Sequence, residues 1–395
     1  MIIGLLGSLI NNENLGCLAL TYSQIALIEK IAMEEKISIC YYVFEPSPDI
    51  KKTETAEKSL GLCKGSITSY DVTPLFRFRR FVHHFNTGLK TLRAFKECDM
   101  FIDLTAGDSF TDIYGQYTFD CETNVKLLVE RMKKPLILGP QTYGPFNNEK
   151  NVNKAVKAIN KSELVLSRDK KSADYIKKYT NKEVKITTDL AFELPYKIKA
   201  MQSDKIKVGL NVSGLLLSEK TEKTEFDLKL KVDYDEYIKK IIEWLLESKI
   251  YDVYIIPHVG KDGTEWVRKI YGDKLNYLGP FENPVEAKNV IASMDIFIGS
   301  RMHATIGAFS AGVSTIPVAY SRKFSGLFNH LKYMHVIDLL EVKTNQAVDK
   351  TINGILNYDK LKNDVNTSLY IVDQELKKNK NAYQELLIKV KKKAI

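Results

Sequence analysis

The residues whose types and spacing most plainly suggest chemistry are Ser300, Arg301 and His303. They follow a short apolar run at 296–298, which predicts a buried parallel strand, and they open a predicted helix at 302–310. The amino end of a helix presents backbone N–H groups and the positive end of the helix dipole. We therefore expect an anion-binding site here, with His303 as a built-in proton donor.

A plainer interpretation exists for an arginine and a histidine in the first turn of a helix. Arg301 and His303 would then cap the helix, pair with a carboxylate or face solvent. A second predicted strand at 315–318 favours the ligand interpretation, because Lys323 follows it closely. Carboxyl ends of adjacent parallel strands meet at one sheet edge, so three cationic side chains would converge on one pocket.

The composition limits the class of protein. A length of 395 residues and an apolar content of 44% suit two domains, each with its own core. The net charge of +9 suits anionic ligands, but no block of arginines indicates a nucleic-acid-binding protein. The five cysteines lack a Cys-x-x-Cys pair and are interpreted as reduced thiols rather than disulfides or zinc ligands: Cys17, Cys40, Cys63, Cys98 and Cys121.

The amino-terminal residues do not resemble a signal peptide, because a basic leader is missing and glycines interrupt the apolar run. The sequence also suggests no apolar run of about 20 residues that would span a bilayer. The expected location is the cytoplasm, with peripheral attachment to the inner face of the membrane left open.

Strands and helices are predicted to alternate along the chain. A strand at 2–6, a glycine-containing loop and a helix at 17–35 open the first domain, although the Gly-x-Gly-x-x-Gly fingerprint is absent. The alternation of strands and helices is interrupted at 196–204, where we predict the boundary between two domains. These are residues 1–198 and residues 199–395, and the second ends in a lysine-rich helical tail. The expected fold class is α/β, with two Rossmann-like doubly wound domains facing a cleft.

Polar residues follow several predicted strands of the first domain. Asp108 and Asp112 come after a strand at 98–104 and would be placed to contact a hydroxyl group, although a helix N-cap is an alternative for Asp108. Arg168 follows another strand. Asp169 beside it is expected to cap a helix, which leaves a structural role as the alternative for Arg168. Three further candidates for substrate binding lie in loops after strands: Asn14, Gln141 and His258.

An ordered set of short motifs resembles the polysaccharide pyruvyl transferase family, over about residues 2 to 331. The motifs are Asn14-Leu15-Gly16, Gly107-Asp108-Ser109, Gly139-Pro140-Gln141 with Gly144-Pro145, Ser167-Arg168-Asp169 with Ser172, Asp189-Leu190-Ala191, Ser300-Arg301-Met302-His303-Ala304 and Tyr320-Ser321-Arg322-Lys323. The resemblance implies two Rossmann-like domains in the GT-B arrangement. It also implies transfer of pyruvate from phosphoenolpyruvate onto two hydroxyls of a sugar as a ketal.

By this resemblance, Arg168, Arg301 and His303 match phosphoenolpyruvate-site positions, and Lys323 is a weaker match. Two departures affect the presumed acceptor domain. Many members carry an acidic residue after the first loop, where this chain has Cys17, and many carry three glycines where it has Thr105-Ala106-Gly107.

The chemistry of such a donor agrees with these residue types. Phosphoenolpyruvate carries a phosphate and a carboxylate, which arginine recognises well. Ketal formation needs a proton donor of near-neutral pKa and electrostatic support for the departing phosphate. His303 would supply the first, and Arg301 with Arg168 the second. No cofactor or metal is expected, because Asp233 and Asp235 open a predicted helix and are better explained as capping residues.

Two rival functions and one further partner remain open. The rivals are a nucleotide-sugar glycosyltransferase of the same architecture and a non-catalytic glycan-binding member of the family. The acceptor is expected to be a sugar of a cell-surface polysaccharide, free or lipid-linked. Two segments are candidates for contact with an anionic membrane: residues 75–85, in which Arg77, Arg79 and Arg80 alternate with aromatic residues, and the tail that ends at Lys393. The alternative for both is that they are solvated faces of helices.

Overall fold

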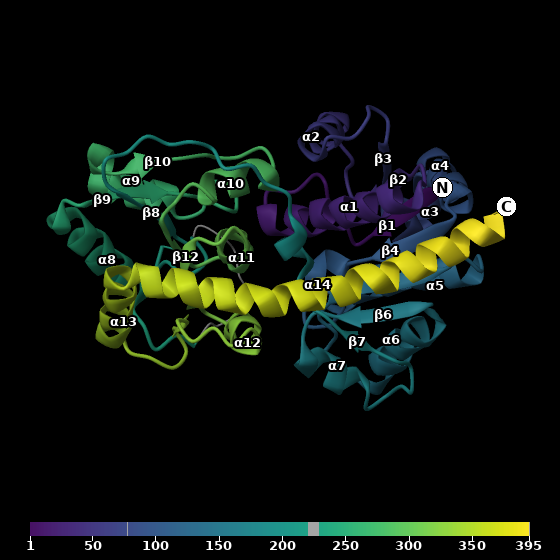
Figure 1. Ribbon diagram of the computed structural model, residues 1–395. Coiled ribbons are helices and arrows are strands. Elements are labelled where there is room, and N and C mark those ends of the chain that lie inside the picture. Colours follow the sequence, from purple (N-terminus) through teal and green to yellow (C-terminus); the bar gives the residue numbers. More distant parts are fainter. Residues whose placement is uncertain (77, 220–228, 395) are drawn as a thin grey trace. The chain divides into compact units, whose positions relative to one another are not determined.

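The computed structural model describes residues 1–76, 78–219 and 229–394, and the chain divides into two compact units. Unit 1 comprises Met1–Asn12, Cys17–Glu193 and Gln374–Ile395, and unit 2 comprises Glu13–Gly16 and Leu194–Asp373. Each unit has its own parallel sheet with helices, as the alternation of strands and helices in the sequence predicts (Figure 1).

The sheet of unit 1 has seven parallel strands in the order β3-β2-β1-β4-β5-β6-β7. The central strands are apolar and almost wholly buried, which is typical of a parallel sheet covered on both faces. The strand bounds are β1 Ile2–Leu6, β2 Cys40–Glu45, β3 Ile67–Asp71, β4 Met100–Asp103, β5 Leu136–Gln141, β6 Leu164–Ser167 and β7 Lys185–Ile186.

The helices of unit 1 connect these strands in sequence. Their bounds are α1 Leu15–Glu35, α2 Ile50–Leu60, α3 Phe78–His83, α4 Phe85–Glu97, α5 Gln116–Arg131, α6 Glu149–Lys161 and α7 Lys170–Ile176, with short 3-10 turns η1 Thr73–Phe76, η2 Thr105–Gly107 and η3 Leu190–Glu193. The described residues of the basic and aromatic segment 75–85 lie in η1, in α3 and at the start of α4, with His84 as the N-cap of α4, and the predicted contact of Arg77 lies outside the described residues.

Helix α1 is long and apolar enough to cross a membrane by length and composition, contrary to the expectation that no such apolar run exists. The mean hydropathy of its apolar window is 1.2, and 78% of that window is buried. Leu18, Ile25 and Ile28 on this helix are among the fully buried core residues. Its apolar character is therefore explained by its place in the core.

The sheet of unit 2 has six parallel strands in the order β10-β9-β8-β11-β12-β13. The strands are β8 Ile206–Asn211, β9 Tyr251–Ile255, β10 Asn276–Tyr277, β11 Ile296–Gly299, β12 Ser314–Ala319 and β13 Ile337–Asp338. The helices are α8 Tyr234–Ser248, α9 Thr264–Tyr271, α10 Pro284–Ile291, α11 Met302–Ser310, α12 Arg322–His330, α13 Thr344–Leu356 and α14 Tyr358–Ala394, with the 3-10 turn η4 Gly272–Lys274. The predicted strand at 296–298 and the helix at 302–310 are confirmed.

The carboxyl-terminal helix α14 differs from the predicted domain division. The predicted second domain includes the whole tail, whereas residues from Gln374 onward belong to unit 1. Tyr383 is fully buried there and donates a hydrogen bond to Gln24 of α1 at 2.8 Å, and Lys380 pairs with Glu34 at 2.5 Å. Partners more than 300 positions away in the sequence thus determine where the tail belongs.

Candidate functional site

The sheet of unit 2 reverses its strand order between β8 and β11, the position at which doubly wound folds bind ligands. Asn211, the last residue of β8, is fully buried and links the two strand ends. Its carbonyl oxygen accepts from the backbone N–H of Ser300 at 3.2 Å, and its side-chain Oδ1 accepts from that of Arg301 at 2.8 Å. These two N–H groups are thus bonded within the protein, and the anion site expected at the start of α11 stays a prediction.

Arg301 is the N-cap residue of α11, and its guanidinium is oriented by Asp262. Arg301 Nη2 donates to Asp262 Oδ1 at 2.9 Å, and Nε donates to Oδ2 at 3.2 Å. Both residues are buried, with 9% and 7% of their surface exposed. Asp262 Oδ1 also accepts from the N–H of Gly214 at 2.6 Å. A two-point pair of this kind fixes the plane of the guanidinium as well as its position.

Ser300 has a structural role that the sequence did not indicate. Its side chain is fully buried, and its Oγ accepts a hydrogen bond from the Tyr234 hydroxyl at 2.7 Å. The same hydroxyl accepts from the backbone N–H of Ser213 at 3.0 Å. Tyr234 therefore connects the loops after β8 and β11, while the contact of Ser300 with substrate stays a prediction.

His303 lies in the first turn of α11 and is half-buried. A Cβ atom placed on Gly16 would lie 2.5 Å from His303 Nδ1, so only glycine fits at position 16 beside this ring. The turn before Gly16 is closed by Asn14, whose Oδ1 accepts from the Gly16 N–H at 2.9 Å. The first loop of the chain thus contributes to the surroundings of His303, within unit 2.

The same loop is joined to His258. Asn14 forms an antiparallel bridge with Val259, and the N–H of Leu15 donates to the carbonyl oxygen of His258 at 3.1 Å. Burial lowers the pKa of His258 to about 3, helped by the nearby His303 and Arg301. His258 is therefore a neutral imidazole at physiological pH, and its predicted contact with substrate would be that of a neutral group.

Lys323 follows β12, the strand next to β11, as predicted. It lies in the first turn of α12 and is exposed, and the N-cap of that helix is Ser321, whose Oγ accepts from the N–H of Phe324 at 3.4 Å. The topology therefore places Arg301, His303 and Lys323 after neighbouring strands of one sheet.

The sheet of unit 1 reverses between β1 and β4, and Arg168 lies at the same edge after β6. Arg168 Nη1 donates to Asp189 Oδ2 at 2.8 Å, and Nε donates to the Thr142 hydroxyl at 3.0 Å. Only 6% of its surface is exposed, and a Cβ on Gly107 would lie 2.9 Å from Nη1. Asp169 beside it caps α7 through the N–H of Ser172 at 2.7 Å, which confirms the predicted cap.

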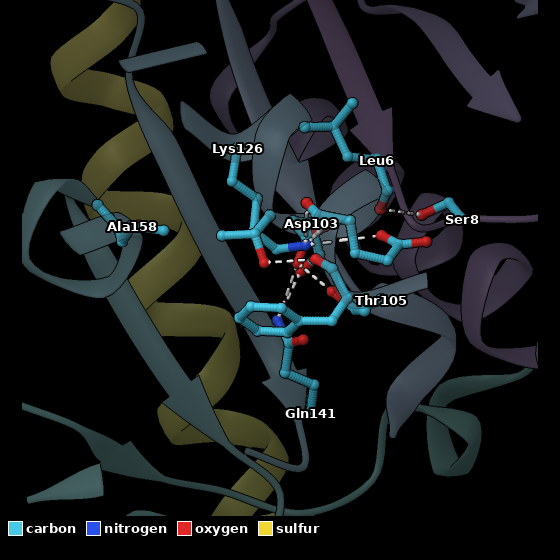
Figure 2. Close-up of polar contacts among 11 residues, drawn as sticks. Leu6, Ser8, Asp103, Thr105, Lys126, Gln141 and Ala158 are labelled. Carbon is cyan, nitrogen blue, oxygen red and sulfur yellow. Dashed lines mark hydrogen bonds and ion pairs between the residues drawn. The ribbon is translucent and has the colours of Figure 1, made fainter. Parts of the chain in front are cut away.

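A buried charge pair underlies the loop after β4 (Figure 2). Lys126 of α5 and Asp103 of β4 have no exposed surface, and Lys126 Nζ lies 2.9 Å from Asp103 Oδ1. Asp103 Oδ2 accepts from the Thr105 hydroxyl at 2.6 Å and from Gln141 Nε2 at 3.2 Å. Gln141 is fully buried and its Nε2 supports this loop, while its contact with substrate stays a prediction.

The loop itself has an unusual backbone. Thr105 and Ala106 both have left-handed conformations, with φ of 43° and 47°, which non-glycine residues rarely adopt. Gly7 approaches so closely that a Cβ there would lie 2.4 Å from Thr105 Cα. The Asp103 and Lys126 network therefore holds a strained loop at the switch point of unit 1.

Asp108 and Asp112, the two carboxylates predicted to contact a hydroxyl group, differ in their surroundings. Asp112 is buried and accepts from the Asn147 N–H at 2.8 Å and from Asn151 Nδ2 at 2.6 Å, so its role is structural. Asp108 is half-buried and accepts from the Tyr114 hydroxyl at 3.4 Å. Helix α5 begins only at Gln116, so the alternative of a helix N-cap at Asp108 is wrong.

Cys17 occupies the position at which many members of the resembled family carry an acid. Burial raises the pKa of its thiol to about 11, with a further upward contribution from Asp108 and an opposing one from Arg168. Cys17 is therefore a neutral thiol near the carboxylate of Asp108. Within residues 1–76, 78–219 and 229–394, no group of three or more His, Cys, Asp or Glu side chains is placed to hold a metal ion.

Several residues of these sites have no local signal in the sequence. Asp262 lies 39 positions from Arg301, and Lys126 lies 23 positions from Asp103. Asp189 begins one of the motifs above, so its position was visible in the sequence although its partner Arg168 was not. The residues found only in the structure are Asn211, Tyr234, Asp262, Asp103 and Lys126.

Comparison with known proteins gives both a family and a fold. The sequence model described as polysaccharide pyruvyl transferase matches residues 14–322. The amylovoran biosynthesis protein AmsJ of Erwinia amylovora is 22% identical over 292 residues, which are 68% of this chain and 68% of that protein.

Solved structures with similar folds match nearly the whole chain. The UDP-GlcNAc 2-epimerase of Neisseria meningitidis, bound to UDP-GlcNAc, has a TM-score of 0.57 at 11% identity and covers 95% of this chain and 100% of its own. The glycosyltransferase of kitacinnamycin has a TM-score of 0.54 at 10% identity and covers 98% of both chains. At these identities the likeness concerns the fold alone, and it confirms the predicted class of two Rossmann-like α/β domains of the GT-B type.

Proposed function

The chain belongs to the polysaccharide pyruvyl transferase family, whose members are transferases that modify polysaccharides. On this premise, we propose that it transfers pyruvate from phosphoenolpyruvate to a sugar. The product is a ketal on two hydroxyls of a cell-surface polysaccharide or its lipid-linked precursor, and phosphate is released. The observation that carries the proposal is the placement of His303 and an oriented Arg301 at the switch point of unit 2.

The proposed reaction has two steps. In the first, the methylene carbon of phosphoenolpyruvate gains a proton while one sugar hydroxyl attacks the adjacent carbon and loses its own proton. In the second, the other hydroxyl attacks the same carbon and loses its proton to a base, the bond between that carbon and the phosphate oxygen breaks, and phosphate leaves with the electron pair. The first step needs an acid and a base, and the second needs a base and stabilisation of the leaving anion.

His303 is assigned as the proton donor of the first step. An imidazole is the side chain best suited to exchange a proton near neutral pH. The neighbouring His258 is neutral because burial lowers its pKa to about 3, so it adds no second cation beside His303. Close packing against Gly16 restricts the orientation of the His303 ring, which a proton transfer in a fixed direction requires.

Arg301 is assigned as the group that stabilises the phosphate. Its pairing with Asp262 fixes the guanidinium before substrate arrives, so no reorganisation is needed during the reaction. Lys323 and, by the family resemblance, Arg168 remain predicted contacts to the donor. Asp108 is the candidate for the base on the acceptor side, since Cys17 is not acidic at neutral pH.

The test is phosphate release from phosphoenolpyruvate, measured with a panel of free and lipid-linked glycan acceptors. We expect acceptor-dependent release, with a mass increase of the acceptor that corresponds to one pyruvate ketal. Calorimetric titration with phosphoenolpyruvate alone tests donor binding without knowledge of the acceptor. Turnover of a nucleotide sugar with no phosphate release from phosphoenolpyruvate would refute the proposal.

We further propose that no divalent metal takes part, because fixed cationic side chains can stabilise the leaving phosphate. The measurement is turnover after treatment with chelator and again after addition of magnesium or manganese. Unchanged turnover is the expected result. Loss with chelator and recovery with metal would instead favour the glycosyltransferase alternative.

A further inference from the structure

The segment from Val72 to Lys96 differs in composition from the rest of the chain. It contains six lysines and arginines and no aspartate or glutamate. The basic residues are Arg77, Arg79, Arg80, Lys90, Arg93 and Lys96, of which Arg77 lies outside the described residues. The whole protein has 49 acidic residues among 395, so a run of this length without one marks a local positive surface.

The structure places large apolar side chains on this same surface. Val82 of α3 and Phe85 of α4 have 59% and 53% of their surface exposed. Arg79, Arg80, His83 and His84, which surround them in sequence, are all exposed. Buried residues of α4, such as Ala94 and Phe95, hold the helix on the unit 1 core, so its exposed residues are not needed for that packing.

A tyrosine at the start of α5 extends the surface. The guanidinium of Arg80 lies 5.6 Å from the centre of the Tyr117 ring, and 39% of the Tyr117 surface is exposed. Exposed apolar side chains, a ring of amphipathic character and arginines together match the interface of a bilayer. We define the basic-apolar patch as Arg79, Arg80, Val82, Phe85 and Tyr117.

The lysine-rich tail, the other candidate from the sequence, is different. Lys380 pairs with Glu34 at 2.5 Å, Lys389 pairs with Glu163 at 3.1 Å, and Lys391 donates to the carbonyl oxygen of Glu35 at 3.1 Å. Many of its charges are thus matched by carboxylates and carbonyls of unit 1. Arg79 and Arg80, by contrast, lie in the segment from Val72 to Lys96, which contains no acidic residue.

We propose that the basic-apolar patch is a docking surface for an anionic lipid bilayer. Arg79 and Arg80 contact the lipid phosphates, while Val82, Phe85 and Tyr117 enter the region of the head groups. Each basic residue near an anionic bilayer strengthens binding by about fivefold, so two arginines account for about 30-fold. The proposal concerns attachment alone and does not depend on the reaction.

The test is flotation of the full-length protein with vesicles of phosphatidylcholine, with and without about 30% phosphatidylglycerol. We expect binding only to the anionic vesicles, and a decrease of binding as the salt concentration rises. The double variant Arg79→Ser with Arg80→Ser should bind about 30-fold more weakly. The double variant Val82→Ser with Phe85→Ser should also bind more weakly while its salt dependence is retained.

The matched control removes two charges from the tail through Lys377→Ser with Lys392→Ser, both exposed residues of α14. Vesicle binding by this control should equal that of the wild type. Circular dichroism and thermal melting establish that each variant is folded. Equal, negligible binding of the wild type to both vesicle types, or equal losses in the patch and tail variants, would overturn the proposal.

Discussion

The two units of this protein use buried charge in different ways at equivalent places in their folds. In unit 1, Asp103 and Lys126 have no exposed surface and shape the backbone of a loop with two left-handed residues. In unit 2, Asp262 orients the side chain of Arg301 in the cap of a helix. The comparison indicates that the Asp103 and Lys126 pair determines the shape of a loop, whereas Asp262 prepares a functional group, the Arg301 guanidinium.

The largest expected effect concerns His303, on the functional side of this comparison. His303→Ala should lower turnover by about 100-fold to 10,000-fold, because it removes the proposed proton donor. Binding of phosphoenolpyruvate, measured by calorimetry, should change little. His330→Ala, which removes an exposed histidine from the last turn of α12, is the control and should leave turnover unchanged. Near-normal turnover of His303→Ala would remove His303 from the mechanism.

The second prediction concerns the buried pair of unit 1. Lys126→Met should lower the free energy of unfolding by about 3–5 kcal/mol, because Asp103 would be left buried without its cation. Urea denaturation measures the loss, and Lys157→Met, an exposed lysine on α6, is the matched control. A loss below about 1 kcal/mol would mean that the pair does not hold the loop.

The sequence predicted local features of the fold and site well. Arg301 and His303 were found because a strand, a glycine and a helix follow one another within 15 residues, which needs no tertiary information. Asp262 and Lys126 were missed because a buried carboxylate or lysine looks like any surface charge until its partner is known. The tail was assigned to the wrong unit for the same reason, since Tyr383 reaches Gln24 across 359 positions.

The predicted substrate contacts Ser300 and Gln141 show another limit. Both lie at the carboxyl end of a strand, which is the correct region for a ligand. The structure buries both, and their hydrogen-bond partners are Tyr234 and Asp103. A polar residue at the end of a strand can therefore either bind a ligand or stabilise the loop that binds it. The spacing of such residues in the sequence does not distinguish these two roles.

The third prediction sharpens the role of Asp262. Asp262→Asn keeps the shape of the side chain but removes the charge that orients Arg301. Turnover should fall by about 10-fold to 100-fold, as for other partners that orient a functional group, while affinity for phosphoenolpyruvate should change less. Steady-state kinetics and calorimetry separate the two effects. Asp273→Asn, an exposed residue, serves as control, and an equal fall in affinity and turnover would argue against a positioning role.

The fourth prediction is a pH dependence of stability from His258. Its pKa is about 3 in the folded protein and about 6.5 when unfolded, so between these values the unfolded state binds more protons. This contribution to stability is present above about pH 6.5 and is lost as the pH falls, by about 1.4 kcal/mol per unit. Urea denaturation from pH 7 to pH 4 measures it. His258→Gln should show a shallower decline than wild type, and parallel curves would contradict the assignment.

The smallest expected effect concerns Cys17, where the acceptor side departs from the family pattern. Because burial raises the pKa of this thiol to about 11, its thiolate fraction at pH 7.5 is on the order of 10⁻³ or less. Iodoacetamide should therefore modify the exposed Cys40 and Cys63 well before Cys17, as followed by peptide mass spectrometry. Cys17→Ala should change turnover by no more than about twofold, because a neutral thiol can act neither as a base nor as the charged carboxylate that many family members carry at this position.

Rapid alkylation of Cys17 with loss of turnover would show that the thiol is ionised and active. The side of unit 1 that holds the loop shaped by Asp103 and Lys126 would then contribute a reactive thiol close to Asp108.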